Sequence, residues 1–421
     1  MENRNRTNPA GSLLPLPIPP PPAPVRAEKT ADATMDRETG TAFSQPDVVC
    51  LSHLRWDFVF QRPQHLLTRF AREARVFYVE EPEFHSGPAT VSVTLRENGV
   101  HVVVPRLPEG LAAEDQVVLQ KELLDDLLRR YAVRRYVLWY YTPMALPFSR
   151  HLQPLAIVYD CMDELSAFAG APRALREREA ELMVRADLVL TGGHSLFEAK
   201  QNLHPNVHPF PSSVDVTHFA QARKGPEEPA DQAAIAHPRL GYFGVIDERM
   251  DLELVRGVAL ARPDWQLVFV GPTVKIDPAS FPNLPNVHSL GRKTYAELPA
   301  YVAGWDVAML PFARNESTRF ISPTKTPEYL AAGRPVVSTS IRDVVRPYGQ
   351  QGLARIADGV NEFVEAAEAA LAEDPLPRLR RADAFLSKIS WERTWSAIRL
   401  LTADAIETRE EEVAESGALA G

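Results

Sequence analysis

The chain has 421 residues, of which 45% are hydrophobic, and its formal net charge is −9 at pH 7. This length predicts two or three domains, and the acidic charge argues against a dedicated nucleic-acid-binding protein, which would normally be basic. Cys50 and Cys161 lie in apolar runs and no Cys/His spacing is typical of a metal site, so we expect buried thiols, no disulfide and no metal.

Residues 1–45 are a low-complexity segment. The stretch LLPLPIPPPPAPV predicts a disordered tail with polyproline character, and a docking site for a proline-binding module is the functional alternative. No sustained apolar region precedes the prolines, so we predict no signal peptide. No apolar run in the chain approaches the roughly 18 residues that span a bilayer.

Strand and helix patterns alternate over residues 46–218 and predict a Rossmann-like N-terminal domain. DVVCLS is the first strand, residues 62–72 are the first helix, and residues 114–131 are a second helix. VSVTL and VHVVVP, separated by Arg-Glu-Asn-Gly, predict a hairpin.

The loop after the first strand lies on the expected ligand edge of an open α/β sheet. Its aromatic and polar side chains are candidate acceptor contacts: Trp56, Asp57, Gln61, Arg62 and His65. Packing explains Trp56 equally well. The arginines of the following helix predict either a basic side facing anionic lipid or, preferably, a solvated helix face.

The apolar run AIVYDCMDE ends in three acids, Asp160, Asp163 and Glu164. A carboxylate at the end of a strand is a reasonable general base, and Asp163 is the preferred candidate because it lies beyond the apolar run. Capping of the following helix is the alternative interpretation.

A polar segment without periodicity, residues 219–236, predicts a linker between domains. Residues 237–390 repeat the strand and helix alternation and predict a second Rossmann-like domain. Residues 391–407 predict a final helix, and the acidic residues 408–421 predict a disordered tail.

The segment from Trp305 to Thr339 predicts a buried strand, a polar loop, a short helix ending at Gly333, and another strand. The helix has two candidate starts, at Ser322-Pro323 and at Thr326-Pro327. Lys325 lies within about one turn of either start and opposes the helix dipole. This pattern predicts a bound anion, most simply a phosphate, and a surface lysine beside a capped helix is the alternative.

Two further strand ends of this domain carry glycine and a basic residue: Gly244 with Arg249, and Gly271 with Lys275. The chain has no G-x-G-x-x-G and no Walker A pattern, so scattered basic contacts to a diphosphate are expected in the cleft between the domains. Glu328 is a candidate acceptor of ribose hydroxyls or an ordinary glutamate of a first helical turn.

Five segments resemble known enzymes. SPTKTPEYLAAGRPVVS resembles the nucleotide-sugar motif of GT-B glycosyltransferases, GYFGVIDERMDLELV resembles their first C-domain strand and phosphate loop, and the WERTW helix resembles the one that crosses back to the N-domain. WDFVFQRPQHLL and VYDCMDELSAF resemble a bacterial group of these enzymes, the group 1 glycosyltransferases. The similarity covers about residues 46–405.

The resemblance implies an α/β fold of two Rossmann-like domains facing a cleft. It also implies transfer of a sugar from a nucleotide-diphosphate sugar donor to a hydroxyl of a glycan or lipid-linked acceptor, without metal or cofactor. The protein would be cytoplasmic, with peripheral contact at the inner membrane.

The resemblance also implies residue roles. Arg249 and Lys325 would stabilise the diphosphate with main-chain N–H groups near Thr324, Glu328 would hold the ribose, and Asp163 would deprotonate the acceptor. The candidate donor site is completed by Gly244, Gly271, Lys275 and Ser322.

Two departures from the family pattern affect the mechanism. Many retaining members carry two glutamates eight positions apart, and here the position before Glu328 is Phe320. The same members place a lysine soon after the loop arginine, where this chain has Met250, Asp251 and Leu252. These departures favour an inverting reaction. The rival functions are a sugar-nucleotide epimerase and a non-catalytic protein that binds a nucleotide-sugar or a partner.

Overall fold

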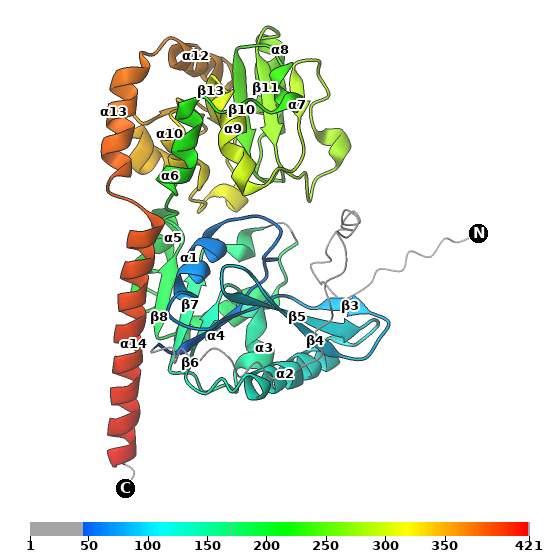
Figure 1. Cartoon of the computed structure of the whole chain (residues 1–421), viewed down its shortest axis with the longest axis vertical. Coiled ribbons are helices and arrows are strands. Elements are labelled where there is room, and N and C mark those ends of the chain that lie inside the picture. The colour runs from blue at the N-terminus through cyan, green and yellow to red at the C-terminus, as the bar shows by residue number, and fades with distance from the viewer. Residues whose placement is uncertain (1–44, 169, 420–421) are drawn as a thin grey trace, which may run out of the picture.

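The structure is a computed structural model that describes residues 45–168 and 170–419. Figure 1 shows two α/β domains, one above the other, with a long C-terminal helix beside the N-terminal domain. The expected fold, two Rossmann-like domains with a helix that crosses back, is confirmed. The predicted proline-rich tail lies outside the described residues, apart from residue 45.

The N-terminal domain is built on a nine-stranded sheet in which the strands of the main path are parallel. Its path runs β3-β5-β2-β1-β6-β7-β8-β9, and β4 pairs antiparallel with β5, which confirms the predicted hairpin. The strands are β1 (Asp47–Leu51), β2 (Val76–Val79), β3 (Glu83–His85), β4 (Thr90–Leu95), β5 (Val100–Pro108), β6 (Tyr136–Tyr140), β7 (Ala156–Cys161), β8 (Leu188–Thr191) and β9 (Val207–Pro209).

Helices cover both faces of this sheet. The first, α1 (Arg62–Phe70), confirms the predicted first helix, and α2 (Ala113–Arg130) confirms the second. The others are η1 (Pro143–Ala145), α3 (Leu146–Ser149), η2 (Leu165–Ala167), α4 (Ala174–Arg185) and α5 (His194–Lys200).

The C-terminal domain holds a six-stranded parallel sheet in the order β12-β11-β10-β13-β14-β15. This is the doubly wound Rossmann order, in which ligands bind where the direction of strand addition reverses, here between β10 and β13. The strands are β10 (Arg239–Phe243), β11 (Gln266–Val270), β12 (Val287–Ser289), β13 (Val307–Leu310), β14 (Val336–Ser338) and β15 (Ala354–Ile356).

The helical segments of this domain begin before its first strand. They are α6 (Val216–Phe219), η3 (Ala220–Lys224), α7 (Ala230–Ala233), α8 (Leu252–Ala261), η4 (Pro278–Ser280), η5 (Tyr295–Glu297), α9 (Leu298–Ala303), η6 (Glu316–Thr318), α10 (Lys325–Ala331), α11 (Arg342–Val344), η7 (Val345–Gly349), α12 (Val360–Leu371) and α13 (Pro375–Leu386).

The predicted linker, residues 219–236, is instead part of the C-terminal domain. Phe219 is fully buried in that domain's core and stacks on Phe243 with ring centroids 5.8 Å apart. Gln232 is also buried, and its side chain donates to the Tyr301 carbonyl and accepts from Trp305 Nε1. The prediction was wrong because a few anchoring side chains fix a segment whose composition is otherwise polar. The chain passes between the domains earlier, between β9 and α6.

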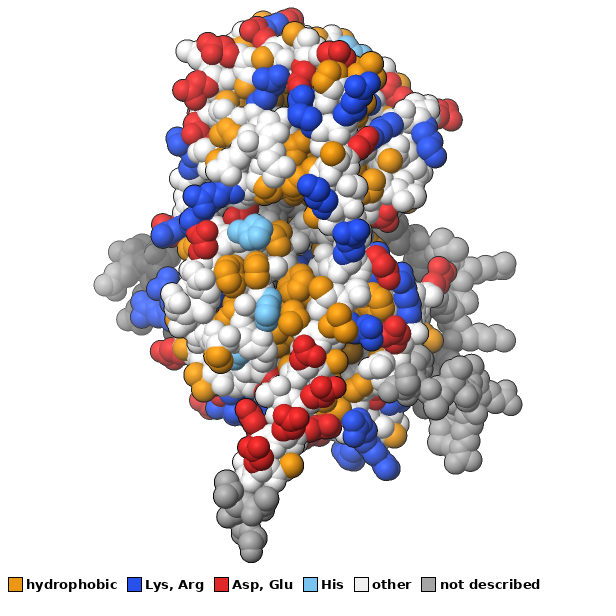
Figure 2. Space-filling model, turned by 90° about the vertical axis from the view of Figure 1, so that its left-hand side faces the viewer, with side chains coloured by type: hydrophobic (Ala, Val, Ile, Leu, Met, Phe, Trp, Pro, Cys, Tyr) orange, Lys and Arg blue, Asp and Glu red, His pale blue; other side chains and the backbone are white. Residues whose placement is uncertain are grey.

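The last helix, α14 (Trp391–Leu419), packs against α1, β7 and β8 of the N-terminal domain. It continues through residues 408–419, which the sequence predicted to be disordered. Ion pairs between Arg409 and Asp187, at 2.7 Å, and between Glu410 and Arg135, at 3.6 Å, attach this part to the N-terminal domain. Figure 2 shows acidic side chains gathered near the free end of α14. No helix of the described residues is long and apolar enough to cross a membrane.

Candidate active site

The loops after β10 and β11 meet through two glycines. Gly244 has a φ of +133° and Gly271 a φ of +148°, and a Cβ on Gly271 would lie 1.9 Å from the Gly244 carbonyl oxygen. A Cβ on Gly244 would lie 2.2 Å from Cε of Lys325. The side chain of Lys325 therefore lies directly on the Gly244 backbone, and only glycine leaves room for it.

The loop that carries Arg249 is held at its C-terminal end by the residues that follow β13. The Asp251 N–H donates to the Pro311 carbonyl at 2.8 Å, and the Ala313 N–H donates to the Arg249 carbonyl at 2.8 Å. Asp247 then fixes the Arg249 guanidinium, accepting from Nε at 2.9 Å and from Nη2 at 2.6 Å. Nη1 donates no hydrogen bond within the described residues, so it remains available to a ligand.

Lys325 is the first residue of α10 and is half-buried. The helix begins at neither predicted start, because Thr324 takes the N-cap position without a side-chain hydrogen bond. Ser322 instead lies against the N-terminal domain, where a Cβ on Gly193 would be 2.8 Å from the Ser322 Cβ. Lys325 forms no ion pair within the part of the chain that the structure describes, and burial lowers its pKa while the Glu328 charge raises it.

Glu328 is buried in α10, and only 7% of its surface is exposed. Burial raises the pKa of this carboxyl, and the Lys325 charge opposes that effect. Its Oε2 has no hydrogen-bond partner among the described residues, and the same is true of the buried hydroxyl of Thr326 in the same first turn of α10. Buried polar atoms without partners are rare in folded proteins, and a bound ligand is one explanation for them.

Asp163 faces these cations from the N-terminal domain, two residues after β7. Burial raises the pKa of its carboxyl to about 6, while the charges of Arg249 and Lys325 lower it and that of Asp247 raises it. The side chain makes no hydrogen bond or ion pair with the described residues. A carboxyl with a pKa close to neutrality is well matched to general base catalysis.

Phe168, which follows η2, lies close to two cations of the other domain. Its ring centroid is 5.6 Å from Cζ of Arg249 and 5.6 Å from Nζ of Lys275. Lys275 is exposed and has a φ of +58°, an uncommon value for a residue with a side chain. The loop from Asp163 to Phe168 therefore reaches across to the basic edge of the C-terminal sheet.

Several known proteins share this architecture. Sucrose-phosphate synthase from Thermosynechococcus elongatus superposes with a TM-score of 0.68 at 14% identity, covering 86% of this chain and all of that chain. HepE of Anabaena, solved with UDP and glucose, superposes with a TM-score of 0.60 at 13% identity, covering 85% of this chain and all of its own. At these identities the similarity shows the GT-B fold alone.

Sequence comparison adds the enzyme class. Residues 237–373 match the family described as glycosyl transferases group 1. The chain is 27% identical over 272 residues to TuaH of Bacillus subtilis (strain 168), named as a teichuronic acid biosynthesis glycosyltransferase, over 60% of this chain and 68% of that protein. The chain is a GT-B glycosyltransferase.

Three of the five predicted acceptor contacts of the glycosyltransferase, Trp56, Arg62 and His65, are buried side chains with packing partners. Trp56 packs edge-on against Tyr78, with ring centroids 4.9 Å apart. Arg62 pairs with Asp160 at 2.9 Å and also donates to the Phe210 carbonyl. These partners favour a structural role for Trp56 and Arg62 in the first loop.

His65 is stacked on Trp391 of α14, with ring centroids 4.5 Å apart. Burial lowers the pKa of His65 to about 3, so the ring is neutral and serves the packing of α14 on α1. The neighbouring arginines of the predicted basic side are paired with acids, Arg69 and Arg72 with Glu392 and Arg75 with Asp47. This arrangement favours the preferred interpretation of a solvated helix face.

The structure adds His53, which the sequence analysis of the glycosyltransferase did not single out. It follows β1 at the ligand edge, and its Nδ1 is buried without a partner among the described residues. Burial, together with the charge of Lys275 from the other domain, lowers its pKa to about 4, and a hydrogen bond with the Tyr141 backbone opposes this shift. Its position directly after a buried strand could have identified His53 as a candidate site residue. The sequence analysis selected residues of the aromatic and polar run that follows instead.

Proposed function

We propose that this glycosyltransferase moves a sugar from a nucleoside diphosphate sugar to a hydroxyl group of a glycan or lipid-linked acceptor. The observation that carries the proposal is the convergence of Arg249 and Lys325 on one edge of the C-terminal sheet, opposite the Asp163 carboxyl. HepE, which shares the fold, is solved with UDP and glucose. A UDP-sugar is therefore the first donor to test.

Each residue has a chemical task in the proposed reaction. The bond between the sugar and the diphosphate breaks, and negative charge accumulates on the leaving group, where Arg249 and Lys325 stabilise it. Asp163 accepts the proton of the acceptor hydroxyl as that oxygen bonds to the sugar carbon. Glu328 accepts hydrogen bonds from the ribose through its free oxygen. We propose an inverting reaction, because Phe320 replaces the first glutamate of the retaining pattern.

Nucleotide binding tests the diphosphate contact. Titration calorimetry with UDP should show binding to the wild-type enzyme, and Lys325→Ala should weaken it about 10- to 100-fold, because a hydrogen bond to a charged group is lost. Lys388→Ala is the matched control, since that lysine is exposed beyond α13. Equal affinity in the two variants would remove Lys325 from the donor site.

Product analysis tests the reaction class. The wild-type enzyme incubated with a UDP-sugar and an acceptor should release UDP and form a glycoside. Incubation with the donor alone should leave the sugar configuration unchanged. Conversion of the donor to an epimer without an acceptor would contradict the proposal.

A further inference from the structure

A cavity of about 500 Å³ lies beside the candidate active site. Side chains from both domains line it: Glu164, Ser166, Ala167, Arg176, Glu179, Glu316 and Phe320. The first five belong to η2 and α4 or to the residues next to them, and the last two belong to η6 and the residues after it. We call it the Phe320 cavity.

Two glutamates of the cavity are held in place by a buried lysine. Lys200 lies 2.8 Å from Oε2 of Glu164 and 2.8 Å from Oε1 of Glu179, and only 5% of its side chain is exposed. Burial by itself lowers the pKa of Lys200, but the neighbouring acidic groups raise it overall. The charged lysine therefore fixes both carboxylates in position.

These carboxylates retain capacity for further hydrogen bonds. Tyr159 and Lys200 both donate to Oε1 of Glu179, whereas its Oε2 accepts no hydrogen bond within the described residues. Oε1 of Glu164 accepts from the Ser166 hydroxyl at 2.6 Å and can accept again. A ligand that fits this side of the cavity must supply hydrogen-bond donors.

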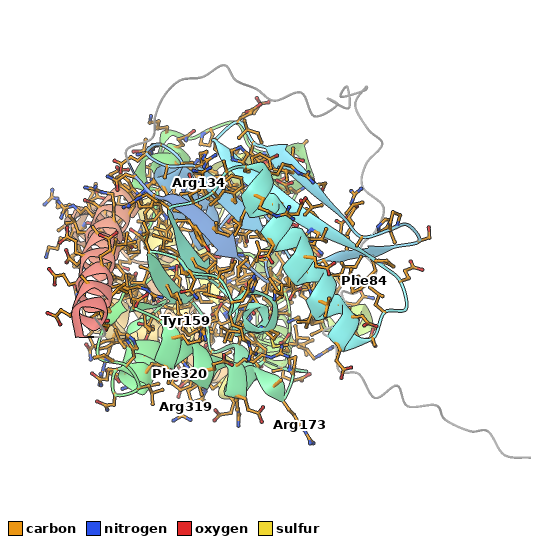
Figure 3. The ribbon with its side chains drawn as sticks, turned by 90° about the horizontal axis from the view of Figure 1, so that it is seen from below. Phe84, Arg134, Tyr159, Arg173, Arg319 and Phe320 are labelled. Atoms are coloured by element: carbon orange, nitrogen blue, oxygen red, sulfur yellow. The ribbon has the colours of Figure 1, made fainter. Side chains whose placement is uncertain are left out.

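Phe320 supplies an apolar wall on the other side of the cavity. Its ring is half-buried, packs against the hydrophobic core of the N-terminal domain, and is covered by Arg319, whose Cζ lies 5.1 Å from the ring centroid. Figure 3 shows Phe320 and Arg319 on the same side of the molecule as Tyr159, away from Phe84 and Arg134. An apolar wall opposite fixed acceptors suits a sugar ring, which has C–H faces and donating hydroxyl groups.

The loop from Asp163 to Phe168 separates the Phe320 cavity from the diphosphate contacts. Asp163 and Phe168 lie toward Arg249, as their electrostatic and ring contacts show. Glu164, Ser166 and Ala167, between them in the sequence, line the cavity. A ligand in the cavity thus lies next to the candidate base.

We propose that the Phe320 cavity binds the acceptor through a neutral sugar unit, with its ring against Phe320 and its hydroxyls on Glu164 and Glu179. This inference rests on the proposed function, because it assigns the acceptor of that reaction. The lining contains three glutamates and one arginine, so an acidic sugar such as a uronic acid is repelled.

Saturation-transfer NMR on the full chain tests the proposal. The probes are the methyl glycosides of glucose, galactose, N-acetylglucosamine and glucuronic acid. We expect at least one neutral glycoside to bind and the glucuronide to bind more than about 10-fold more weakly, since like charges disfavour it. Binding of none of the neutral glycosides, or preferred binding of the glucuronide, would overturn the proposal.

Substitutions locate the bound sugar. Phe320→Leu keeps an apolar side chain but loses the flat ring, and Glu179→Gln removes one charged acceptor. Each should weaken binding of the neutral glycoside about fivefold or more. Phe84→Leu is the matched control, because that phenylalanine is exposed on β3 and does not line the cavity. Unchanged affinity in both cavity variants would show that the sugar binds elsewhere.

Nucleotide affinity separates failure of this inference from failure of the proposed function. Calorimetry with UDP, GDP and ADP should give the same affinities for Phe320→Leu as for the wild-type enzyme, which also shows that the variant is folded. If the wild-type enzyme binds no nucleotide but binds a neutral glycoside in a Phe320-dependent way, the proposed donor is wrong and the cavity is a sugar site. If nucleotide binds and the cavity variants have no effect, the assignment of the cavity is wrong.

Discussion

Replacing Asp163 with asparagine should stabilise the protein near neutral pH while it removes activity. Burial raises the pKa of Asp163 in the folded protein to about 6, from an ordinary value of 3.8. Below pH 3.8 the carboxyl is protonated in both the folded and unfolded states, so its ionisation does not lower the free energy of unfolding. Between these two values the free energy of unfolding decreases as the pH rises, because the unfolded chain releases the proton more readily.

Above pH 6 the folded protein carries the full cost of a buried charge. A difference of about two in pKa corresponds to about 3 kcal/mol, which is an upper bound because a carboxylate can attract water or a cation. Asparagine has nearly the same shape and no charge, so Asp163→Asn should gain about 1–3 kcal/mol at pH 7.5. For a domain of this size the melting temperature should rise by at least about 2 °C.

Thermal unfolding of the wild-type enzyme and of Asp163→Asn at pH 7.5 and pH 4.5 measures this effect. The stability gain should shrink at the lower pH, where the native carboxyl is already protonated. Asp404→Asn is the matched control, because that side chain is exposed on α14 and should show no gain at either pH. A less stable Asp163→Asn variant at pH 7.5, or a gain that does not change with pH, would refute the reasoning.

The same carboxyl sets the expected pH dependence of transfer. As a general base Asp163 must be ionised, so kcat/KM should fall about tenfold per pH unit below pH 6 and level off above it. Asp163→Asn should lower kcat strongly and leave UDP affinity unchanged. A wild-type profile that is flat between pH 5 and pH 7, or a fully active variant, would exclude Asp163 as the base.

Two further substitutions test the architecture. Gly244→Ala puts a Cβ 2.2 Å from Cε of Lys325 and should weaken UDP binding about 10-fold or more in calorimetry. The control is Gly359→Ala, whose Cβ meets no heavy atom within 4 Å and which should bind UDP as the wild-type enzyme does. Equal UDP affinities of the two variants would show that the position of the lysine is unimportant. Trp391→Ala removes the ring stacked on His65 of α1 and should lower the free energy of unfolding in urea by about 3–5 kcal/mol. The control is Leu400→Ala, at an exposed position of α14, which should change that free energy by no more than about 0.5 kcal/mol. Equal losses in the two variants would show that α14 does not depend on this contact.

Local patterns in the sequence were sufficient for the fold class. Apolar runs bounded by turn residues identified the strands, and the alternation of strands with helical patterns predicted two parallel sheets. The Arg-Glu-Asn-Gly turn predicted the hairpin of β4 and β5, and the first helix was predicted from Arg62, where α1 begins. These features depend on residues that are close together in the chain, so they can be predicted from the sequence alone.

Segment boundaries depended on distant contacts. Residues 219–236 have a polar composition, yet the buried side chains of Phe219 and Gln232 attach them to the C-terminal domain. Residues 408–419 are acidic, yet α14 continues through them, and Arg409 pairs with Asp187 near the start of this segment. In both cases one or two long-range contacts outweigh the average composition.

The sequence also placed Asp163, Arg249 and Lys325 at the ends of their strands, because parallel strands bring successive loops to one edge of a sheet. It did not determine which side chains of the first loop face the cleft between the domains, because Trp56 and His65 pack inward. Burial, pKa and the available hydrogen-bond capacity of a side chain are set by everything packed around it. Only the tertiary structure therefore decided which residues face the site and which charges act on one another there.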